Sequence, residues 1–177
     1  MDNKSIPSFF IIGAQKSATS SIHALLSQDN RISLPYRKET HFFSTNFSKS
    51  IDWYLSMFKS SKYLLRGEID PSYIHYDNSL LNIKKYNLNP KFIFIFRKPI
   101  ERAYSHYLMS INRNYESLSF NDALKIESDR LNNDNNNFSF SNHSYLLRGD
   151  YCQQINRCKN VFPNSEYLYI KFDDFIN

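Results

Sequence analysis

The chain contains little cysteine, and this scarcity excludes two common kinds of stabilisation. Its two cysteines, Cys152 and Cys158, lie six positions apart in a segment whose pattern predicts a helix. They would therefore point to different faces and would not form a disulfide. No Cys/His spacing typical of a metal site is present, so we expect no bound metal. Two thiols in a chain of this size suit a reducing compartment.

Long apolar runs are also missing. No window approaches the roughly 20 apolar residues that span a bilayer, and Phe9–Ile12 is too short for a signal-peptide core. We therefore expect a soluble, cytoplasmic protein with no membrane span. The sequence has 177 residues, is 41% hydrophobic and contains no internal repeat. It is expected to form one domain over residues 1–177, and its pattern indicates no particular oligomeric state.

The net charge of +5 favours an anionic partner, although a solvated basic surface would account for it equally well. We expect no nucleic-acid partner. Apolar and polar patterns alternate between strand and helix periods along the chain. Strands are predicted at Phe9–Ile12, Arg31–Leu34, Tyr63–Ile69, Lys91–Phe96 and Glu166–Phe172. Helices are predicted at Thr19–Ser27, Asp52–Phe58, Asn78–Tyr86, Ile100–Asn112, Ser119–Leu131 and Ser144–Val161, with a surface loop at Leu131–Asn137.

This alternation predicts an α/β fold, a P-loop-like parallel sheet with helices on both faces. Ligands of such folds bind beyond the carboxyl ends of the strands. The residues that follow each predicted strand are therefore the ones to search for chemistry.

The first of these segments runs from Gly13 to Ser21. A buried strand ends at Gly13, Lys16 and several hydroxyl residues follow, and a helix begins at about Thr19. Such a loop offers backbone N–H groups, an ammonium and hydroxyls to a phosphate or sulfate. The spacing is not that of a Walker A loop, since Lys16 comes three residues after Gly13 and no second glycine precedes it. A P-loop kinase is therefore disfavoured, and an ordinary turn with a solvent lysine is the alternative.

The second segment follows the clearest strand of the chain. Arg97 stands at the carboxyl end of Lys91–Phe96, and Ser105 lies eight residues further, about two helical turns on. A guanidinium fork and a hydroxyl can converge on one anion. Alternatively, Arg97 pairs with a carboxylate and Ser105 only fills space. Glu101 and Arg102 are interpreted as helix-surface or packing charges.

The third segment is Arg37–Phe43. Glu39 and His41 lie two apart, and on an extended segment they would face the same side. Either could serve as a general base, while a polar turn before Phe42 and Phe43 is the alternative. A fourth segment, Gly67–Tyr73, predicts a loop with polar side chains on the same rim, which alone is a weak signal.

Together, the four segments resemble the sulfotransferases that use 3′-phosphoadenosine 5′-phosphosulfate (PAPS), in the branch of heparan sulfate sulfotransferases and their bacterial relatives. Ile11–Ser21 is similar to the family's 5′-phosphosulfate loop, Lys38–Phe43 to the segment with the catalytic glutamate, and Phe96–Ser105 to the 3′-phosphate motif. Tyr145–Tyr151 and Phe162–Phe175 resemble its later helix and strand.

The resemblance implies a PAPS-dependent enzyme that transfers a sulfuryl group, without a metal, to a hydroxyl or amine of an acceptor such as a glycan. It implies Glu39 as general base, Lys16 at the leaving phosphate and His41 near the acceptor. The implied cofactor-binding residues are Lys16, Ser17, Ala18, Thr19, Ser20, Ser21, Arg97 and Ser105.

Three features depart from the family's pattern. Ser17 and Ala18 replace the loop's usual glycines, and Ile69 stands where the heparan sulfate enzymes have a lysine. Family domains also continue past the last predicted strand, so we expect a C-terminally truncated chain. The alternative function is a catalytically impaired remnant that binds a nucleotide or anion without turnover.

Overall fold

The computed structural model describes residues 6–59 and 65–176. By its internal contacts the chain forms two compact units. The first comprises Met1–Phe96 and Gln154–Asn177, and the second comprises Arg97–Gln153. Each unit is described by itself.

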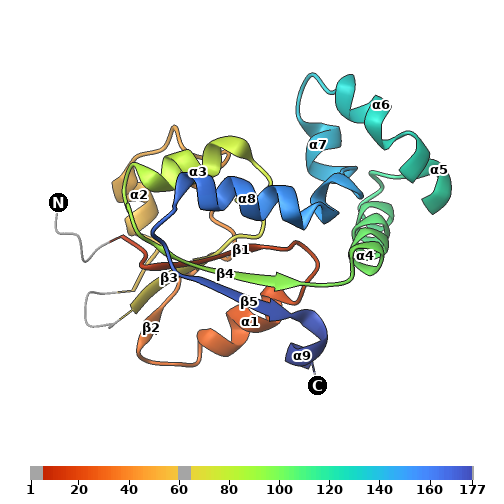
Figure 1. The fold of residues 1–177 in the computed structure, drawn as a ribbon. Coiled ribbons are helices and arrows are strands. Elements are labelled where there is room, and N and C mark those ends of the chain that lie inside the picture. The colour runs from red at the N-terminus through yellow and green to blue at the C-terminus, as the bar shows by residue number, and fades with distance from the viewer. Residues whose placement is uncertain (1–5, 60–64, 177) are drawn as a thin grey trace. The chain divides into compact units, whose positions relative to one another are not determined.

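The first unit is built on a parallel sheet (Figure 1). Its strands are β1 (Phe9–Gly13), β2 (Ile32–Ser33), β3 (Leu65–Ile69), β4 (Lys91–Phe96) and β5 (Tyr167–Lys171). Within the described residues the order is β2-β3-β1-β4-β5, and every neighbouring pair is parallel. The predicted α/β class with a parallel sheet is confirmed. Of the strand predicted at Tyr63–Ile69, Tyr63 and Leu64 lie outside the described residues.

Helices cover both faces of the sheet because the strand residues alternate between two cores. Phe10 and Ile12 point into one core, and Phe9 and Ile11 into the other. Three helices lie on the Phe10 face, namely α2 (Ile51–Leu55), α3 (Asp77–Lys84) and α8 (Tyr151–Val161) (Figure 1). The opposite face carries α1 (Thr19–Leu26) and α9 (Phe172–Ile176). With both faces covered, polar chemistry is confined to the ends of the strands.

Gly67 allows β3 to lie against β1. It is the register partner of Phe9, and a Cβ atom at this position would lie 1.9 Å from Phe9 Cζ. No side chain fits there, so a glycine is required immediately before the polar end of β3.

The second unit is helical. It contains α4 (Pro99–Asn112), α5 (Phe120–Lys125), α6 (Glu127–Asn132), α7 (Phe138–Asn142), the 3-10 turn η1 (Leu147–Gly149) and the first residues of α8. Pro99 occupies the first turn of α4, where its missing N–H costs no hydrogen bond.

Two predicted helices are wrong in extent. The segment Ser119–Leu131 is broken at Ile126, whose φ of −97° and ψ of 3° are not helical. The adjacent Glu127 side chain accepts backbone N–H groups of a distant segment, so a tertiary contact overrides local propensity. Leu131 and Asn132 also belong to α6 and not to the predicted surface loop.

The segment predicted as one helix over Ser144–Val161 is a 3-10 turn followed by α8. Asp150, with φ of −77° and ψ of 74°, separates the two, and its Oδ1 accepts the N–H of Gln153 at 3.1 Å. The carboxylate thus caps α8. The predicted last strand extends to Phe172, whereas β5 ends at Lys171 and α9 begins at Phe172.

Candidate active site

The loop between β1 and α1 is held at the carboxyl edge of the sheet. Ala14 N–H donates to Ile95 O at 2.9 Å, so the loop starts next to β4. Lys16 (φ 69°) and Ala18 (φ 59°) both have left-handed backbone conformations. These two reversals turn the chain back on itself, and Ala18 then occupies the N-cap position of α1.

The residues of this loop fit an anionic group. Ser17 is fully buried, and its Oγ has no hydrogen-bond partner among the described residues. The first turn of α1 contains no acidic residue, and its N–H groups have no acceptors within the helix. Thr19 is buried, whereas Ser20 and Ser21 are exposed. A buried hydroxyl and helix N–H groups beside Lys16 form a suitable donor set for a phosphate.

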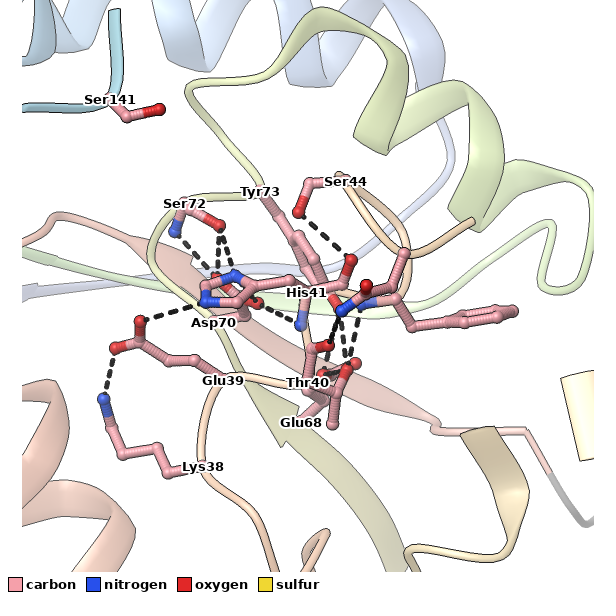
Figure 2. Close-up of polar contacts among 12 residues, drawn as sticks. Lys38, Glu39, Thr40, His41, Ser44, Glu68, Asp70, Ser72, Tyr73 and Ser141 are labelled. Atoms are coloured by element: carbon pink, nitrogen blue, oxygen red, sulfur yellow. Dashed lines mark hydrogen bonds and ion pairs between the residues drawn. The ribbon is translucent and has the colours of Figure 1, made fainter. Parts of the chain in front are cut away.

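A second polar cluster, which we call the Glu39 cluster, consists of Lys38, Glu39, His41, Asp70 and Ser72 (Figure 2). Lys38 Nζ lies 2.6 Å from Glu39 Oε1, and His41 Nε2 lies 3.8 Å from Glu39 Oε2. Both carboxylate oxygens of Glu39 therefore face a cation or a potential cation, and the side chain is still about one third exposed.

The backbone that brings Glu39 and His41 together is not the predicted extended segment. Residues 36–41 form no strand, and Glu39 (φ 60°) and His41 (φ 53°) have left-handed conformations. The extended prediction is wrong, because two left-handed residues with a buried threonine between them set the direction of both side chains. The two side chains nevertheless face one another, with His41 Nε2 3.8 Å from Glu39 Oε2, so they lie on the same side as predicted.

His41 is oriented by the end of β3. Its backbone N–H donates to Asp70 Oδ2 at 3.0 Å, and its ring Nδ1 lies 2.9 Å from the same oxygen. Ser72 Oγ donates to the other oxygen, Oδ1, at 2.5 Å. The hydrogen bond to Asp70 raises the pKa of His41 above its ordinary value of 6.5, although burial opposes the shift. The imidazole thus keeps a proton on Nδ1 and presents Nε2 to Glu39.

Beneath the Glu39 cluster, three hydroxyls converge on the buried carboxylate of Glu68. Tyr54 donates to Oε2 at 2.5 Å, Tyr73 donates to Oε1 at 3.0 Å, and Thr40 also donates to Oε1. Burial raises the pKa of Glu68 to about 7, and the neighbouring Asp70 carboxylate adds to the rise. Because Thr40 lies between the two catalytic candidates in the chain, this network fixes their backbone from below.

The sequence did not assign Glu68, Asp70 or Ser72 to the site. A signal was present, since two carboxylates alternate with Ile69 at the end of a strand and so share one face. Glu68 and Asp70 are 1% and 0% exposed, which is unusual for carboxylates, and the donors described above compensate their burial. Ile69 points away from them into the opposite core.

Glu39, His41 and Asp70 also form a group whose potential ligand atoms lie within 4.8 Å of one another. A search of Cys/His spacing misses this group, because its members come from two separate segments. Lys38 Nζ already lies on Glu39 Oε1, and His41 Nδ1 already lies on Asp70 Oδ2.

In the second unit, Arg97 precedes α4, and Ser105 lies half-buried within that helix. Arg97 Nε lies 3.3 Å from Glu101 Oε2. In this structure Arg97 therefore pairs with a carboxylate, which is the alternative that the sequence left open. Glu101 and Ser105 are four residues apart and share a helix face. Arg102 is fully buried, and its Nη2 donates to the carbonyl oxygen of Tyr145.

These features define an α/β protein with a donor-rich loop that fits an anion and a carboxylate–imidazole pair at one edge of its parallel sheet. A family model described as "Sulfotransferase domain" matches residues 7–177. The chain therefore belongs to the sulfotransferase domain family, and the predicted family is confirmed.

Individual relatives agree with this assignment. The crystal structure of a sulfotransferase from Alicyclobacillus acidocaldarius superposes with a TM-score of 0.81 and 28% identity, over 97% of this chain and 75% of that one. A membrane-associated sulfotransferase, kil1, from Dictyostelium discoideum is 32% identical over 110 residues, which cover 60% of this chain and 23% of the relative. The mouse heparan sulfate glucosamine 3-O-sulfotransferase 3B1 is 24% identical over 99% of this chain and 43% of its own length. The chain thus spans less than half the length of these two curated relatives. Among the described residues no helix is long and apolar enough to cross a membrane.

Proposed function

We propose that this chain transfers the sulfuryl group of PAPS to a hydroxyl or amine group of a carbohydrate acceptor. The observation that carries the proposal is Glu39, whose carboxylate lies between Lys38 and His41 at the same sheet edge as the Lys16 loop. Family membership supports the reaction, and the printed names of the heparan sulfate relatives support a glycan as acceptor. The cytoplasmic location stays a prediction.

Lys16 and the donors of residues 17–21 would hold the 5′-phosphosulfate, and Arg97 and Ser105 would hold the 3′-phosphate. In the reaction an acceptor oxygen or nitrogen bonds to sulfur while the bond from sulfur to the 5′-phosphate oxygen breaks. The departing phosphate gains negative charge, which the Lys16 ammonium and nearby N–H groups stabilise.

Glu39 would take the proton that the acceptor loses. Its carboxylate is fixed by Lys38 on one oxygen, while the other faces the His41 ring that Asp70 orients. A general base held in this way contributes about 10²- to 10⁴-fold to a rate. The buried network around Glu68 supports the backbone of the same segment.

The test is Glu39→Gln, which keeps the side-chain shape and removes the base. Transfer of ³⁵S from labelled PAPS to desulfated heparin should fall by at least about 100-fold, while calorimetry should show unchanged binding of 3′,5′-adenosine bisphosphate (PAP). Glu166→Gln is the matched control, because Glu166 is exposed and pairs with Lys91 at the amino ends of β4 and β5.

The two outcomes that contradict the proposal differ in meaning. If folded wild-type protein gives no heat with millimolar PAP, the donor assignment is wrong. If it binds PAP but transfers no sulfate to any of a panel of glycans, the non-catalytic remnant is the correct function.

A further inference from the structure

The segment Tyr145–Tyr151 is fastened to the helices of the second unit. Arg102, in α4, donates from Nη2 to the carbonyl oxygen of Tyr145. Glu127, in α6, accepts the next two backbone N–H groups, from Leu146 at 2.7 Å and from Leu147 at 2.9 Å. The 3-10 turn that follows is thereby held in place on two sides.

The last residue of the segment, Tyr151, contacts the backbone of Arg97. The phenolic hydroxyl of half-buried Tyr151 donates to Arg97 O at 2.9 Å. That carbonyl belongs to the peptide that joins Arg97 to Lys98, the N-cap of α4. Because β4 fixes the backbone up to Phe96, holding this next peptide restrains rotation about the Cα–C bond of Arg97 and so the direction in which its side chain leaves the backbone.

Arg97 is also held at its other end, where Nε pairs with Glu101. Burial raises the pKa of Tyr151, and the neighbouring Arg102 and Arg97 guanidinium groups only reduce that rise. The phenol therefore stays neutral at physiological pH and remains a hydrogen-bond donor. A carbonyl contact at the base and a carboxylate contact at Nε together restrict a long, flexible side chain.

We propose that Tyr151 is a positioning residue for the 3′-phosphate subsite, acting through the Arg97 carbonyl. The inference rests on the proposed function, because it requires Arg97 to be a ligand of that phosphate. By orienting Arg97, Tyr151 would contribute to the preference of the site for a nucleotide that carries a 3′-phosphate. Tyr151 itself need not touch the phosphate.

The experiment compares PAP with 5′-AMP, which lacks the 3′-phosphate, by calorimetry. Tyr151→Phe removes one oxygen and keeps the ring. Its affinity for PAP should fall about three- to tenfold, the effect of one hydrogen bond, while its affinity for 5′-AMP stays within twofold of wild type. Tyr107→Phe is the control, since the Tyr107 hydroxyl also donates to a backbone carbonyl of this unit, that of Leu118 at 2.9 Å. Its affinity for both nucleotides should be unchanged.

A double-mutant cycle with Arg97→Ala tests the route of the effect. If Tyr151 acts through Arg97, Tyr151→Phe should have no further effect on PAP binding once the guanidinium is gone. Unchanged PAP affinity in Tyr151→Phe, an equal loss for both nucleotides, or a loss that persists without Arg97 would each overturn the inference. Thermal unfolding of each variant shows that it is folded.

Failure of the underlying function gives a different result. If Arg97→Ala alone leaves PAP affinity unchanged, the 3′-phosphate role of Arg97 is wrong, whatever Tyr151→Phe does. If Arg97→Ala weakens PAP binding and Tyr151→Phe does not, only the positioning role is wrong.

Discussion

At the scale of single residues, the site depends on side chains whose charge is set by a neighbour. Asp70 receives both the ring and the backbone N–H of His41, and it lies wholly inside the protein. A buried carboxylate that orients an imidazole fixes which ring nitrogen carries the proton. Glu39 then faces a ring of fixed orientation, 3.8 Å from its Oε2.

Asp70→Asn should lower the pKa of the His41 imidazole. The raised pKa rests first on the hydrogen bond to Asp70, and burial, which remains in the variant, opposes it. The carboxylates of Glu39 and Glu68 remain and still raise the pKa, so we expect the imidazole to titrate at a lower pH in the variant than in wild type, as measured by NMR of labelled histidine. His23 provides an internal reference, since burial and the neighbouring Lys38 lower its pKa in both proteins.

The same shift affects stability with a definite sign. Because the folded pKa of His41 exceeds the unfolded value, its contribution to stability is complete below about pH 6.5. It is lost as the pH rises through the folded pKa. An Asp70→Asn protein whose His41 pKa equals that of wild type would contradict the role given to the carboxylate.

At the scale of the loops and helices, backbone strain lies next to the proposed chemistry. Ala18 has φ 59° at the N-cap of α1 and carries a Cβ in a conformation that favours glycine. Ala18 replaces one of the family's usual loop glycines, and its backbone has the positive φ that suits a glycine. Ser17, in contrast, is not among the residues with positive φ in the described part of the chain.

Ala18→Gly should therefore stabilise the protein. Relief of the left-handed strain outweighs the extra freedom that glycine gives the unfolded chain, by about 1 kcal/mol. Thermal unfolding should show a rise in Tm of roughly 2–4 °C. Ala24→Gly is the matched control, because Ala24 is exposed inside α1 and the same change should destabilise by about 0.5–1 kcal/mol there. Equal effects at the two positions would contradict the assignment of strain to Ala18.

The end of β3 gives a second prediction at this scale. The folded pKa of Glu68 is raised to about 7 from 4.5, so its contribution to stability is complete below pH 4.5 and is lost as the pH rises through 7. The difference corresponds to on the order of 3 kcal/mol. Glu68→Gln cannot ionise, so its free energy of unfolding should change much less between pH 5 and 8, as measured by urea denaturation.

Glu166→Gln should keep the wild-type pH dependence, because Glu166 is exposed and distant from this network. If Glu68→Gln falls in stability between pH 5 and 8 as steeply as wild type, the cost of ionising Glu68 has been misassigned.

The sequence predicted the bounds of a helix or strand correctly where a local pattern alone determines them. Lys91–Phe96 has the predicted bounds because five consecutive apolar residues, Phe92–Phe96, end at a charged pair and a proline. The break at Ile126 was missed because it accompanies a contact of Glu127 with the distant N–H groups of Leu146 and Leu147. The break at Asp150 has a local cause, since its Oδ1 accepts the N–H of Gln153, and it was missed because Asp150 was not recognised as an N-cap. The sequence also placed Glu39 near His41 and indicated a polar rim at Gly67–Tyr73, but it gave no sign that Asp70 contacts His41, because the two residues are 29 positions apart.

At the scale of the whole molecule, a net charge of +5 and a donor loop at the sheet edge suit a strongly anionic nucleotide. A ligand that binds only the folded chain stabilises it by a free energy that grows with the logarithm of its concentration divided by its dissociation constant. Stability therefore reports binding without any acceptor, which separates the donor assignment from the acceptor chemistry.

PAP at 100 times its dissociation constant should stabilise the folded chain by about 2.7 kcal/mol. For a chain of 177 residues this corresponds to a rise in Tm of roughly 5–10 °C, measurable by differential scanning fluorimetry. Lys16→Ala should lose most of the rise at the same PAP concentration, since it removes the ammonium from the proposed 5′-phosphate loop. Lys125→Ala, at an exposed residue of α5 that pairs with Asp122, should keep it. A rise equal for PAP and inorganic sulfate would show that the chain binds anions without recognising the nucleotide.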